Sequence, residues 1–247
     1  NEAIKQTNLG KALEVCLRGV DLGKELELNA RAALARSLVR ETPVPESVKL
    51  AIGSDYGKLC DIYYPGVDVA VRSSATTEDS KEASFAGQYE SFLNVSGEVE
   101  IVEKWRRCVA SMFTERSVGY HLENGLHPLE SAVAVVVMKM ARSDKACSGV
   151  MFTIDPDSGH SGVIHIASSY GLGELVVQGV VTPDTYTIWK EGLRKGKSPI
   201  VHRTLGSKEQ MLVYDDELAN EVSSVRVPLD LRKRWSLERD ECVMLGE

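Results

Sequence analysis

The sequence predicts an α+β fold in which mostly antiparallel sheets are flanked by helices. Two observations carry this prediction. Apolar side chains recur at helical spacing through the first sixty residues, and after Pro128 the pattern changes to short β-branched runs separated by turn residues. Helices that come first and strands that follow are typical of this class.

Three helices are expected in the first third of the chain, over residues 12–20, 26–42 and 45–60. Asp21 and Pro43 interrupt the apolar period, and Pro45 stands at the entrance of the third helix, where its fixed φ suits the first turn. We expect these helices to pack on the part of the chain that carries Arg72.

The period changes after the turn at Pro65 and Gly66. Short β-type runs at 68–74 and 91–95 flank a polar loop, and one long amphipathic helix is expected over 98–125. Residues 132–140, AVAVVVMKM, form a nearly continuous apolar run, which is typical of a strand covered on both faces.

Further strands are predicted at 148–155, 162–171, 185–190 and 199–205, with a short helix at 172–179. Turn residues such as those of DPDSG separate them. The whole chain, 1–247, is expected to be one domain with three parts. These are a mainly helical part (1–66), a lobe with the arginine and the polar loop (67–128) and a strand-rich lobe (129–247).

Composition excludes several classes of protein. The formal net charge of -7 and the lack of a long Lys/Arg block disfavour a nucleic-acid binder. Five cysteines without a CxxC pair favour neither a disulfide framework nor a structural zinc site, and they fit a reducing cytosol. No segment reaches the roughly 18 apolar residues that span a bilayer. We therefore expect a cytoplasmic protein without nucleic-acid or membrane partners.

One stretch, VRSSATTEDSKEASFAGQYESFLNV (71–95), combines a cation, hydroxyls and a glycine. Arg72 follows apolar strand residues, and its guanidinium suits phosphate or carboxylate oxygens. Gly87 lets the backbone approach a ligand, and Gln88 and Ser91 are able to donate to the same oxygens. This pattern indicates a polyphosphate site, but a Ser/Thr/Asp/Gly-rich stretch is also typical of a plain loop. Both interpretations stay open on residue types alone.

A second stretch, SSYGLGELVVQGVVTPDTYTIWK (168–190), has a similar ambiguity. Gly171 and Gly173 bracket a turn that opens a short helix, with Glu174 in its first turn. An acid there is favoured by the helix dipole, so Glu174 serves either structure or function.

Three segments in this order, the stretch 71–95, CSGVMFTIDP and YGLGELVVQGVVTPDTY, closely resemble the nucleotide-binding domain of phosphoenolpyruvate synthases. The same domain occurs in pyruvate phosphate dikinases and rifampin phosphotransferases. The resemblance covers nearly the whole chain and implies an ATP-grasp fold, with ATP between two α+β lobes. It also implies that ATP phosphorylates a histidine on a separate domain and that the phosphoryl group passes to pyruvate, giving phosphoenolpyruvate, AMP and phosphate.

The resemblance assigns roles to residues of the polar loop. Arg72 stands where the family has its arginine on the ATP phosphates. Gly87, Gln88 and Ser91 stand in the phosphate-covering loop, with Ser91 where a threonine is often found.

The resemblance also identifies the strand that ends at residue 140 as the hinge that hydrogen-bonds the adenine edge. Lys139 and Met140 would bind through their backbones. The family often has Gln where this chain has Met138, and a thioether sulfur is at best a weak acceptor. We therefore expect adenine binding without a side-chain bond at this position.

Several groups that the resemblance implies have no counterpart in the sequence. These are the ATP lysine in a Gly-Gly-Lys-Gly segment, the acid and glutamine that bind metal, and the carrier histidine. The five histidines of the chain are expected on the surface or in strands. ATP and Mg²⁺ are the implied cofactors, with the Mg²⁺ ligands outside this chain.

We therefore expect a truncated fragment that does not complete catalysis alone. Its expected partners are the phosphohistidine and pyruvate-binding domains of its parent. A nucleotide-binding or interaction module without catalysis is the rival hypothesis, and Met138 favours it slightly.

Overall fold

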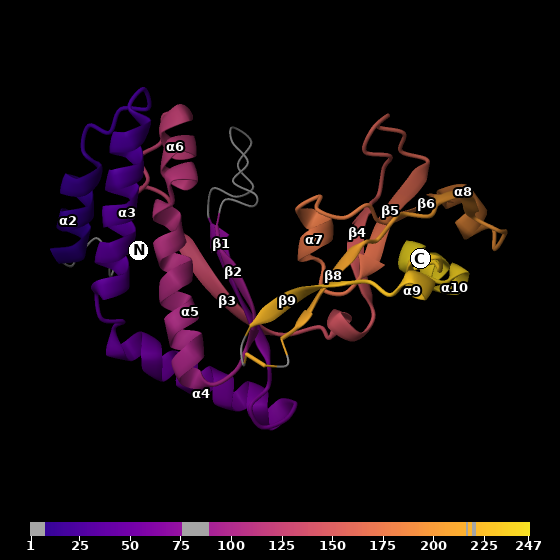
Figure 1. Ribbon diagram of the computed structural model, residues 1–247, viewed down its shortest axis with the longest axis horizontal. Coiled ribbons are helices and arrows are strands. Elements are labelled where there is room, and N and C mark those ends of the chain that lie inside the picture. The colour runs from indigo at the N-terminus through magenta and orange to yellow at the C-terminus, as the bar shows by residue number, and fades with distance from the viewer. Residues whose placement is uncertain (1–7, 76–88, 216, 219–220) are drawn as a thin grey trace. The chain divides into compact units, whose positions relative to one another are not determined.

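The computed structural model describes residues 8–75, 89–215, 217–218 and 221–247. They fold into two compact units, Asn1–Met140 and Ala141–Glu247, and each is described by itself (Figure 1). Within the described residues the paired strands are all antiparallel, and most of the helical residues precede most of the strands. The predicted α+β class is therefore confirmed.

The first unit combines helices with a three-stranded sheet of order β2-β1-β3. Its elements are α2 (Asn8–Leu17), α3 (Glu25–Glu41), α4 (Glu46–Ile62), β1 (Val69–Ala75), β2 (Ser91–Val95), α5 (Glu98–Ala110), η1 (Ser111–Phe113), α6 (Glu115–Glu123) and β3 (Val133–Lys139). The three helices expected in the first third of the chain are present as α2, α3 and α4.

The helices of the first unit pack on the strands as well as on one another. Leu13, Ala32 and Phe113 belong to one apolar cluster, formed mainly by helical residues. Tyr56 of α4 packs in a second cluster with Val69 of β1, and its hydroxyl donates to the carbonyl of Val67 over 3.0 Å. The expected packing of the early helices on the Arg72-bearing part is thus confirmed.

The single long helix predicted over 98–125 is wrong, because Thr114 interrupts it. Thr114 has extended backbone angles (φ -67°, ψ 152°), and its side-chain oxygen accepts from the N–H of Ser117 over 3.1 Å. A threonine that caps a following helix in this way ends the preceding one. The segment therefore divides into α5, the short η1 and α6.

Strand β3 is not covered on both faces, in contrast to the prediction. Its residues alternate between exposed and half-buried, and Val136 and Met138 are 44% and 47% exposed. Because β3 pairs with β1 along its whole length, β3 belongs to the first unit, which continues to Met140. The three-part subdivision itself stays a prediction.

The second unit contains a four-stranded sheet of order β4-β5-β6-β7 and a separate hairpin of β8 and β9. Its elements are η2 (Ser143–Lys145), β4 (Cys147–Phe152), β5 (Val163–Tyr170), α7 (Glu174–Val177), β6 (Asp184–Trp189), α8 (Lys190–Arg194), β7 (Ile200–Thr204), β8 (Gln210–Tyr214), β9 (Val222–Arg226), α9 (Leu229–Arg232) and α10 (Arg239–Gly246). The predicted strands and the short helix at 172–179 are present, whereas the elements after residue 205 are additional.

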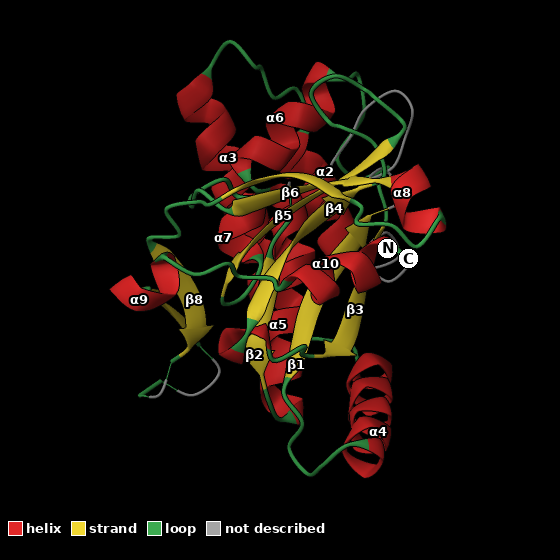
Figure 2. Cartoon of the chain, turned by 90° about the vertical axis from the view of Figure 1, so that its right-hand side faces the viewer, coloured by secondary structure: helices red, strands yellow, loops and turns green. Residues whose placement is uncertain are grey.

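One face of the four-stranded sheet carries the core of the second unit. Ile164, Ile166 and Ile188 cluster with Cys242 of α10, and Figure 2 shows α10 beside strands β4 to β6. Tyr186 lies in the same cluster and donates its hydroxyl hydrogen to the carbonyl of Leu237 over 3.2 Å. The segment before α10 is therefore held on the sheet by apolar burial and by a buried hydrogen bond.

A fully buried ion pair joins three segments of the second unit. Nζ of Lys208 lies 2.5 Å from Oδ1 of Asp184, and both side chains are 0% exposed. Oδ1 also accepts from the N–H of Gly206 over 2.8 Å, and Oδ2 accepts from the N–H of Ser236 over 2.7 Å. The carboxylate thus connects the start of β6, the turn before β8 and the segment before α10.

Two predictions made from composition concern the cysteines and membrane-spanning segments. All five cysteines are free thiols, as the absence of a CxxC pair predicts. In the part of the chain that the structure describes, the helices are all too short or too polar to cross a bilayer.

Candidate functional site

The sheet of the first unit has one covered and one open face. Ile101 and Cys108 of α5 pack against Val69 and Val71 of β1 and Val95 of β2; Figure 1 shows α5 running along these strands. Since side chains alternate along a strand, residues 70, 72 and 74 project from the opposite face. That second face is the candidate site, which we call the open face.

The strand register brings three of the predicted site residues together on the open face. Arg72 lies opposite Ser91 of β2 on one side and opposite Val136 of β3 on the other. Met138 lies two residues along β3, opposite Ala70. Directly paired residues of an antiparallel ladder point to the same side of the sheet. The exposed side chains of Arg72, Ser91 and Met138 therefore share one surface.

Cys108 of α5 lies on the covered face of the sheet, and its thiol carries no negative charge. Its thiol lies 3.6 Å from the carbonyl oxygen of Val71, and burial raises the pKa of Cys108 to about 12, with a smaller contribution from Glu90. The thiol is therefore neutral at physiological pH, and it is no nucleophile because the thiolate is the reactive form. The guanidinium of Arg72 lies on the exposed face, where it suits an anionic ligand.

The start of β2 is fixed against α5 by hydrogen bonds. The N–H of Glu90 donates to Oγ of Ser111 over 3.1 Å, and Oγ of Ser111 donates to the carbonyl of Cys108 over 2.7 Å. Oγ of Ser73 donates to the carbonyl of Glu90 over 3.5 Å. Because Ser91 follows Glu90 directly, this network holds its hydroxyl in the same row as Arg72.

The backbone of Lys139 faces the outer edge of β3. The N–H of Met140 donates to the carbonyl of Asp68 over 3.0 Å, and this bond brackets the pair of Val69 and Lys139. In an antiparallel ladder such a pair directs its own N–H and C=O groups away from the partner strand. Within the described residues β3 pairs with β1 alone, so the Lys139 groups point outward.

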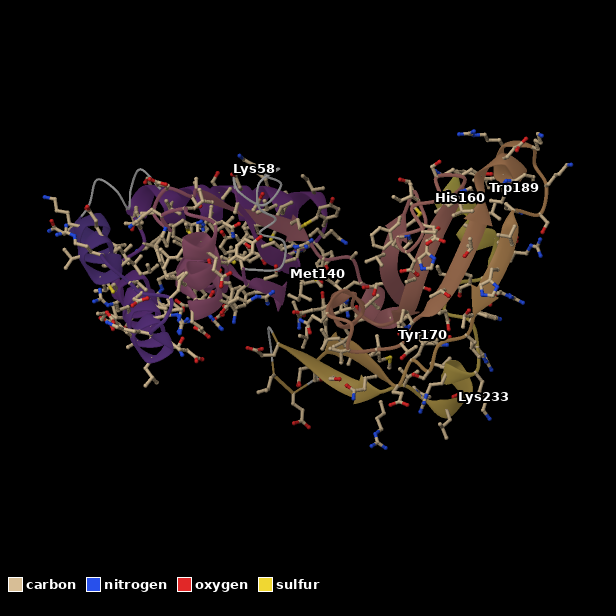
Figure 3. The ribbon with its side chains drawn as sticks, turned by 90° about the horizontal axis from the view of Figure 1, so that it is seen from above. Lys58, Met140, His160, Tyr170, Trp189 and Lys233 are labelled. Atoms are coloured by element: carbon tan, nitrogen blue, oxygen red, sulfur yellow. The ribbon has the colours of Figure 1, made fainter. Side chains whose placement is uncertain are left out.

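Met140 is placed differently from Lys139. Its side chain is 5% exposed, its N–H is used by Asp68, and its carbonyl accepts from Nζ of Lys139 over 3.2 Å. Figure 3 labels Met140, the last residue of the first unit. Of the two hinge residues, Lys139 offers the more accessible backbone groups.

Gly87 and Gln88 lie outside the described residues, as do the hydroxyl and acidic residues 76–79. Their predicted contacts with phosphate stay predictions.

The second stretch has a structural explanation for one of its glycines. Gly171 has φ +85°, and a Cβ at this position would lie 2.7 Å from the carbonyl oxygen of Leu212, so backbone conformation and close packing both require glycine. Oε1 of Glu174 accepts from Nε2 of Gln178 one turn along α7, over 3.1 Å. These contacts explain Gly171 and Glu174 without a ligand.

The predicted location of His121 is wrong. It lies in α6 with 0% exposure, neither on the surface nor in a strand. Its Nδ1 lies 2.7 Å from the carbonyl of Ser117, and its Nε2 lies 2.7 Å from Oγ of Ser131. Desolvation lowers the pKa of His121, so the ring is neutral. The four-residue spacing to Ser117 on a helix was the available signal.

Known proteins have sequences similar to that of this chain. The family described as "Pyruvate phosphate dikinase, AMP/ATP-binding domain" matches residues 1–247. The phosphoenolpyruvate synthase of Synechocystis sp. is 41% identical over 98% of this chain and 30% of its own length. That of Aquifex aeolicus is 41% identical over 97% of the chain and 28% of its own length. That of Escherichia coli is 37% identical over 100% of the chain and 31% of its own length.

An α+β unit with an arginine on an open sheet face, together with these similarities, defines an ATP-binding domain. The chain belongs to the pyruvate phosphate dikinase AMP/ATP-binding domain family. It spans about 30% of the length of the curated relatives it matches.

Proposed function

We propose that this chain is the ATP-binding part of a pyruvate, water dikinase. In the proposed reaction ATP phosphorylates a carrier histidine, and the phosphohistidine then phosphorylates pyruvate. With one water consumed, the products are phosphoenolpyruvate, AMP and phosphate. The observation that carries the proposal is the 37–41% identity to phosphoenolpyruvate synthases over at least 97% of the chain.

The open face supplies the proposed phosphate site. Arg72 binds phosphate oxygens through its guanidinium, and Ser91, in the same row, donates its hydroxyl hydrogen. From the resemblance to the family we propose that Gly87 and Gln88, which lie outside the described residues, also bind the phosphates. Phosphoryl transfer depends mainly on positioning and on neutralising charge, which is the chemistry that such groups supply.

The end of β3 supplies the proposed base site. The outward N–H and C=O of Lys139 bind the adenine edge, whereas Met140, whose N–H and carbonyl already have partners, supports Lys139 and makes no bond of its own to the base. Met138 lies on the open face beside this edge and offers an apolar contact without a strong acceptor.

Mg²⁺ is proposed as a cofactor of the longer protein. Within the described residues there is no group of three or more His, Cys, Asp or Glu side chains that could hold a metal ion. We therefore assign Mg²⁺ no ligands among the described residues.

The proposed partners of the chain are the phosphohistidine and pyruvate-binding domains of the longer protein, in the cytoplasm. We propose no nucleic-acid or membrane partner. Because the lysine, the metal ligands and the carrier histidine have no counterpart here, the 247 residues alone bind nucleotide at most and do not turn it over.

The test is ³¹P NMR of the native protein that carries this chain, with Mg·ATP and with or without pyruvate. Pyruvate-dependent appearance of AMP, phosphate and phosphoenolpyruvate supports the dikinase. Arg72→Ala is expected to slow ATP consumption by about 10²–10³-fold, the loss typical of removing one charge-stabilising group. Arg116→Ala, at an exposed arginine of α6, is the matched control. ATP that stays intact with pyruvate would rule the synthase out.

The same experiment addresses three alternatives. The family description names pyruvate phosphate dikinase, for which phosphate replaces water as the second acceptor and pyrophosphate appears. A rifampin phosphotransferase consumes ATP only when rifampin is added. A module without catalysis, which Met138 favours, binds ATP but leaves its ³¹P spectrum free of AMP under all of these conditions.

A further inference from the structure

Two consecutive tyrosines follow α4 and lie at the end of β3. Tyr63 is the residue directly after the helix, and Tyr64 follows it; their exposed fractions are 51% and 42%. Both contact the residues that surround the last pair of the β1–β3 ladder. Half-exposed rings contribute little to the core, so their contacts with this strand end are of interest.

Tyr63 fixes the side chain of Lys139. Nζ of Lys139 lies 5.2 Å from the centroid of the Tyr63 ring, within the range of a cation–π contact. The same ammonium group donates to the carbonyl of Met140 over 3.2 Å. The lysine side chain is thus held between the ring and the backbone of the next residue, which restrains the peptide that joins Lys139 to Met140.

Tyr64 fixes the other strand of the same pair. Its hydroxyl donates to Oδ1 of Asp68, a residue that is 9% exposed. The carbonyl of Asp68 accepts the N–H of Met140 over 3.0 Å, and this is the bond that directs the backbone of Lys139 outward. Tyr64 therefore acts on Lys139 through Asp68 and Met140.

The two tyrosines thus restrain both flanks of one outward-facing backbone segment. An adenine edge offers one amino donor and one ring-nitrogen acceptor, which match one C=O and one N–H. A guanine edge presents a carbonyl acceptor and a ring N–H donor in the corresponding places. A fixed backbone segment discriminates between these edges, whereas a loose one reorients to suit either.

We propose that Tyr63 and Tyr64 are positioning residues that set the Lys139 backbone for adenine and so determine selectivity for ATP. This inference rests on the proposed function, because it takes the outer edge of β3 as the base site. It adds two side chains that act through Lys139, Asp68 and Met140.

The experiment measures dissociation constants of the native protein by calorimetry, with ATP, GTP and inorganic tripolyphosphate as ligands. The variants are Tyr63→Leu and Tyr64→Phe, with Tyr120→Phe on α6 as the matched control. We expect ATP binding to weaken about three- to tenfold in each variant, the effect of one cation–π contact or one hydrogen bond. Tripolyphosphate binding should stay within about twofold, and the preference for ATP over GTP should fall.

Each other outcome has one meaning. Unchanged ATP and GTP affinities in both variants would overturn the inference and leave the proposed function intact. An equal loss of ATP and tripolyphosphate affinity would also overturn it, because that result indicates general loosening of the unit. A wild-type protein that binds neither ATP nor tripolyphosphate would contradict the proposed function itself, and the inference with it.

Discussion

The two units differ in the groups that are fully buried beside their sheets. In the first unit the sheet is backed by apolar side chains with 0% exposure, including Val69, Val71 and Ile101, and its buried histidine is neutral. The second unit has an apolar cluster on its sheet as well, but it also buries a charged pair, Lys208 and Asp184, with 0% exposure. The first unit therefore depends mainly on apolar volume behind its sheet, whereas the second depends on a buried charge pair in addition to its apolar core. Different substitutions should therefore destabilise the two units.

The largest effect is expected when the buried pair is broken. Lys208→Met leaves the Asp184 carboxylate buried without its cation, which typically costs about 3–5 kcal/mol of unfolding free energy. Urea denaturation followed by tryptophan fluorescence is suited to a variant with Trp105→Phe, because the two remaining tryptophans, Trp189 and Trp235, lie in the second unit; Figure 3 labels Trp189.

A double variant serves as the control for this prediction. Asp184→Asn combined with Lys208→Met removes both charges while keeping an acceptor for Gly206, so it should be less destabilised than Lys208→Met alone. A loss below about 1 kcal/mol for Lys208→Met would show that the charge pair does not hold the second unit together.

The matching test of the first unit removes volume. Ile101→Ala deletes a fully buried side chain between α5 and the sheet, and we expect a loss of about 3 kcal/mol from the cavity and the lost burial. Val99→Ala, on the same helix at 81% exposure, should change stability by no more than about 0.5 kcal/mol. Amide hydrogen exchange should show the loss of protection in residues 8–140. Equal effects of the two variants would contradict the packing described here.

The pH dependence of the unfolding free energy should also differ between the two units. Burial lowers the pKa of His121 relative to the unfolded chain, where a histidine has a pKa of about 6.5. As the pH falls below about 6.5 the unfolded state takes up the proton first, so stability decreases, with a slope of at most about 1.4 kcal/mol per pH unit. Urea midpoints at several pH values between 7.5 and 5.5 measure this slope.

Two variants sharpen the pH comparison. His121→Gln should lose the slope in this window, at the cost of lower stability at pH 7.5. His202→Gln, at an exposed histidine of β7, should keep it. A slope that survives His121→Gln would assign the effect to another group.

The smallest effect is expected at Met138. Met138→Gln introduces a strong acceptor and donor on the open face, and one net hydrogen bond to the base should tighten ATP binding about threefold. Met151→Gln, at a methionine of β4 with a similar exposed fraction (45% against 47%), is the matched control in the second unit. Titration calorimetry with ATP decides between them, and weaker binding for Met138→Gln would indicate that the position makes an apolar contact.

Local patterns predicted the elements better than their pairing. The helices before residue 62 and the strands from β4 to β7 follow from apolar periodicity and turn residues. The break at Thr114 did not, because a capping threonine inside an amphipathic pattern looks like one more polar residue. The exposure of Val136 and Met138 was not predicted either. A run of β-branched residues indicates a strand covered on both faces, and the run alone does not show which elements cover each face.

The candidate site shows the same division. Arg72 could be singled out because it follows a strand and precedes hydroxyl residues. That Ser91 and Met138 share its face depends on strand register, which pairs residues distant in sequence. The roles of Tyr63 and Tyr64 could not be seen at all, because each acts through a partner at least four positions away.

The boundary at Met140 and Ala141 has a consequence for how such domains vary in evolution. Each sheet of the described chain closes within one unit, and the polypeptide passes from the first to the second at this point. An insertion just after Ala141 would therefore leave the register of every described strand unchanged. A one-residue insertion inside β3 would move the side chains on one side of it to the opposite face of the sheet. Insertions and deletions among homologues should therefore be common just after Ala141 and rare within β3.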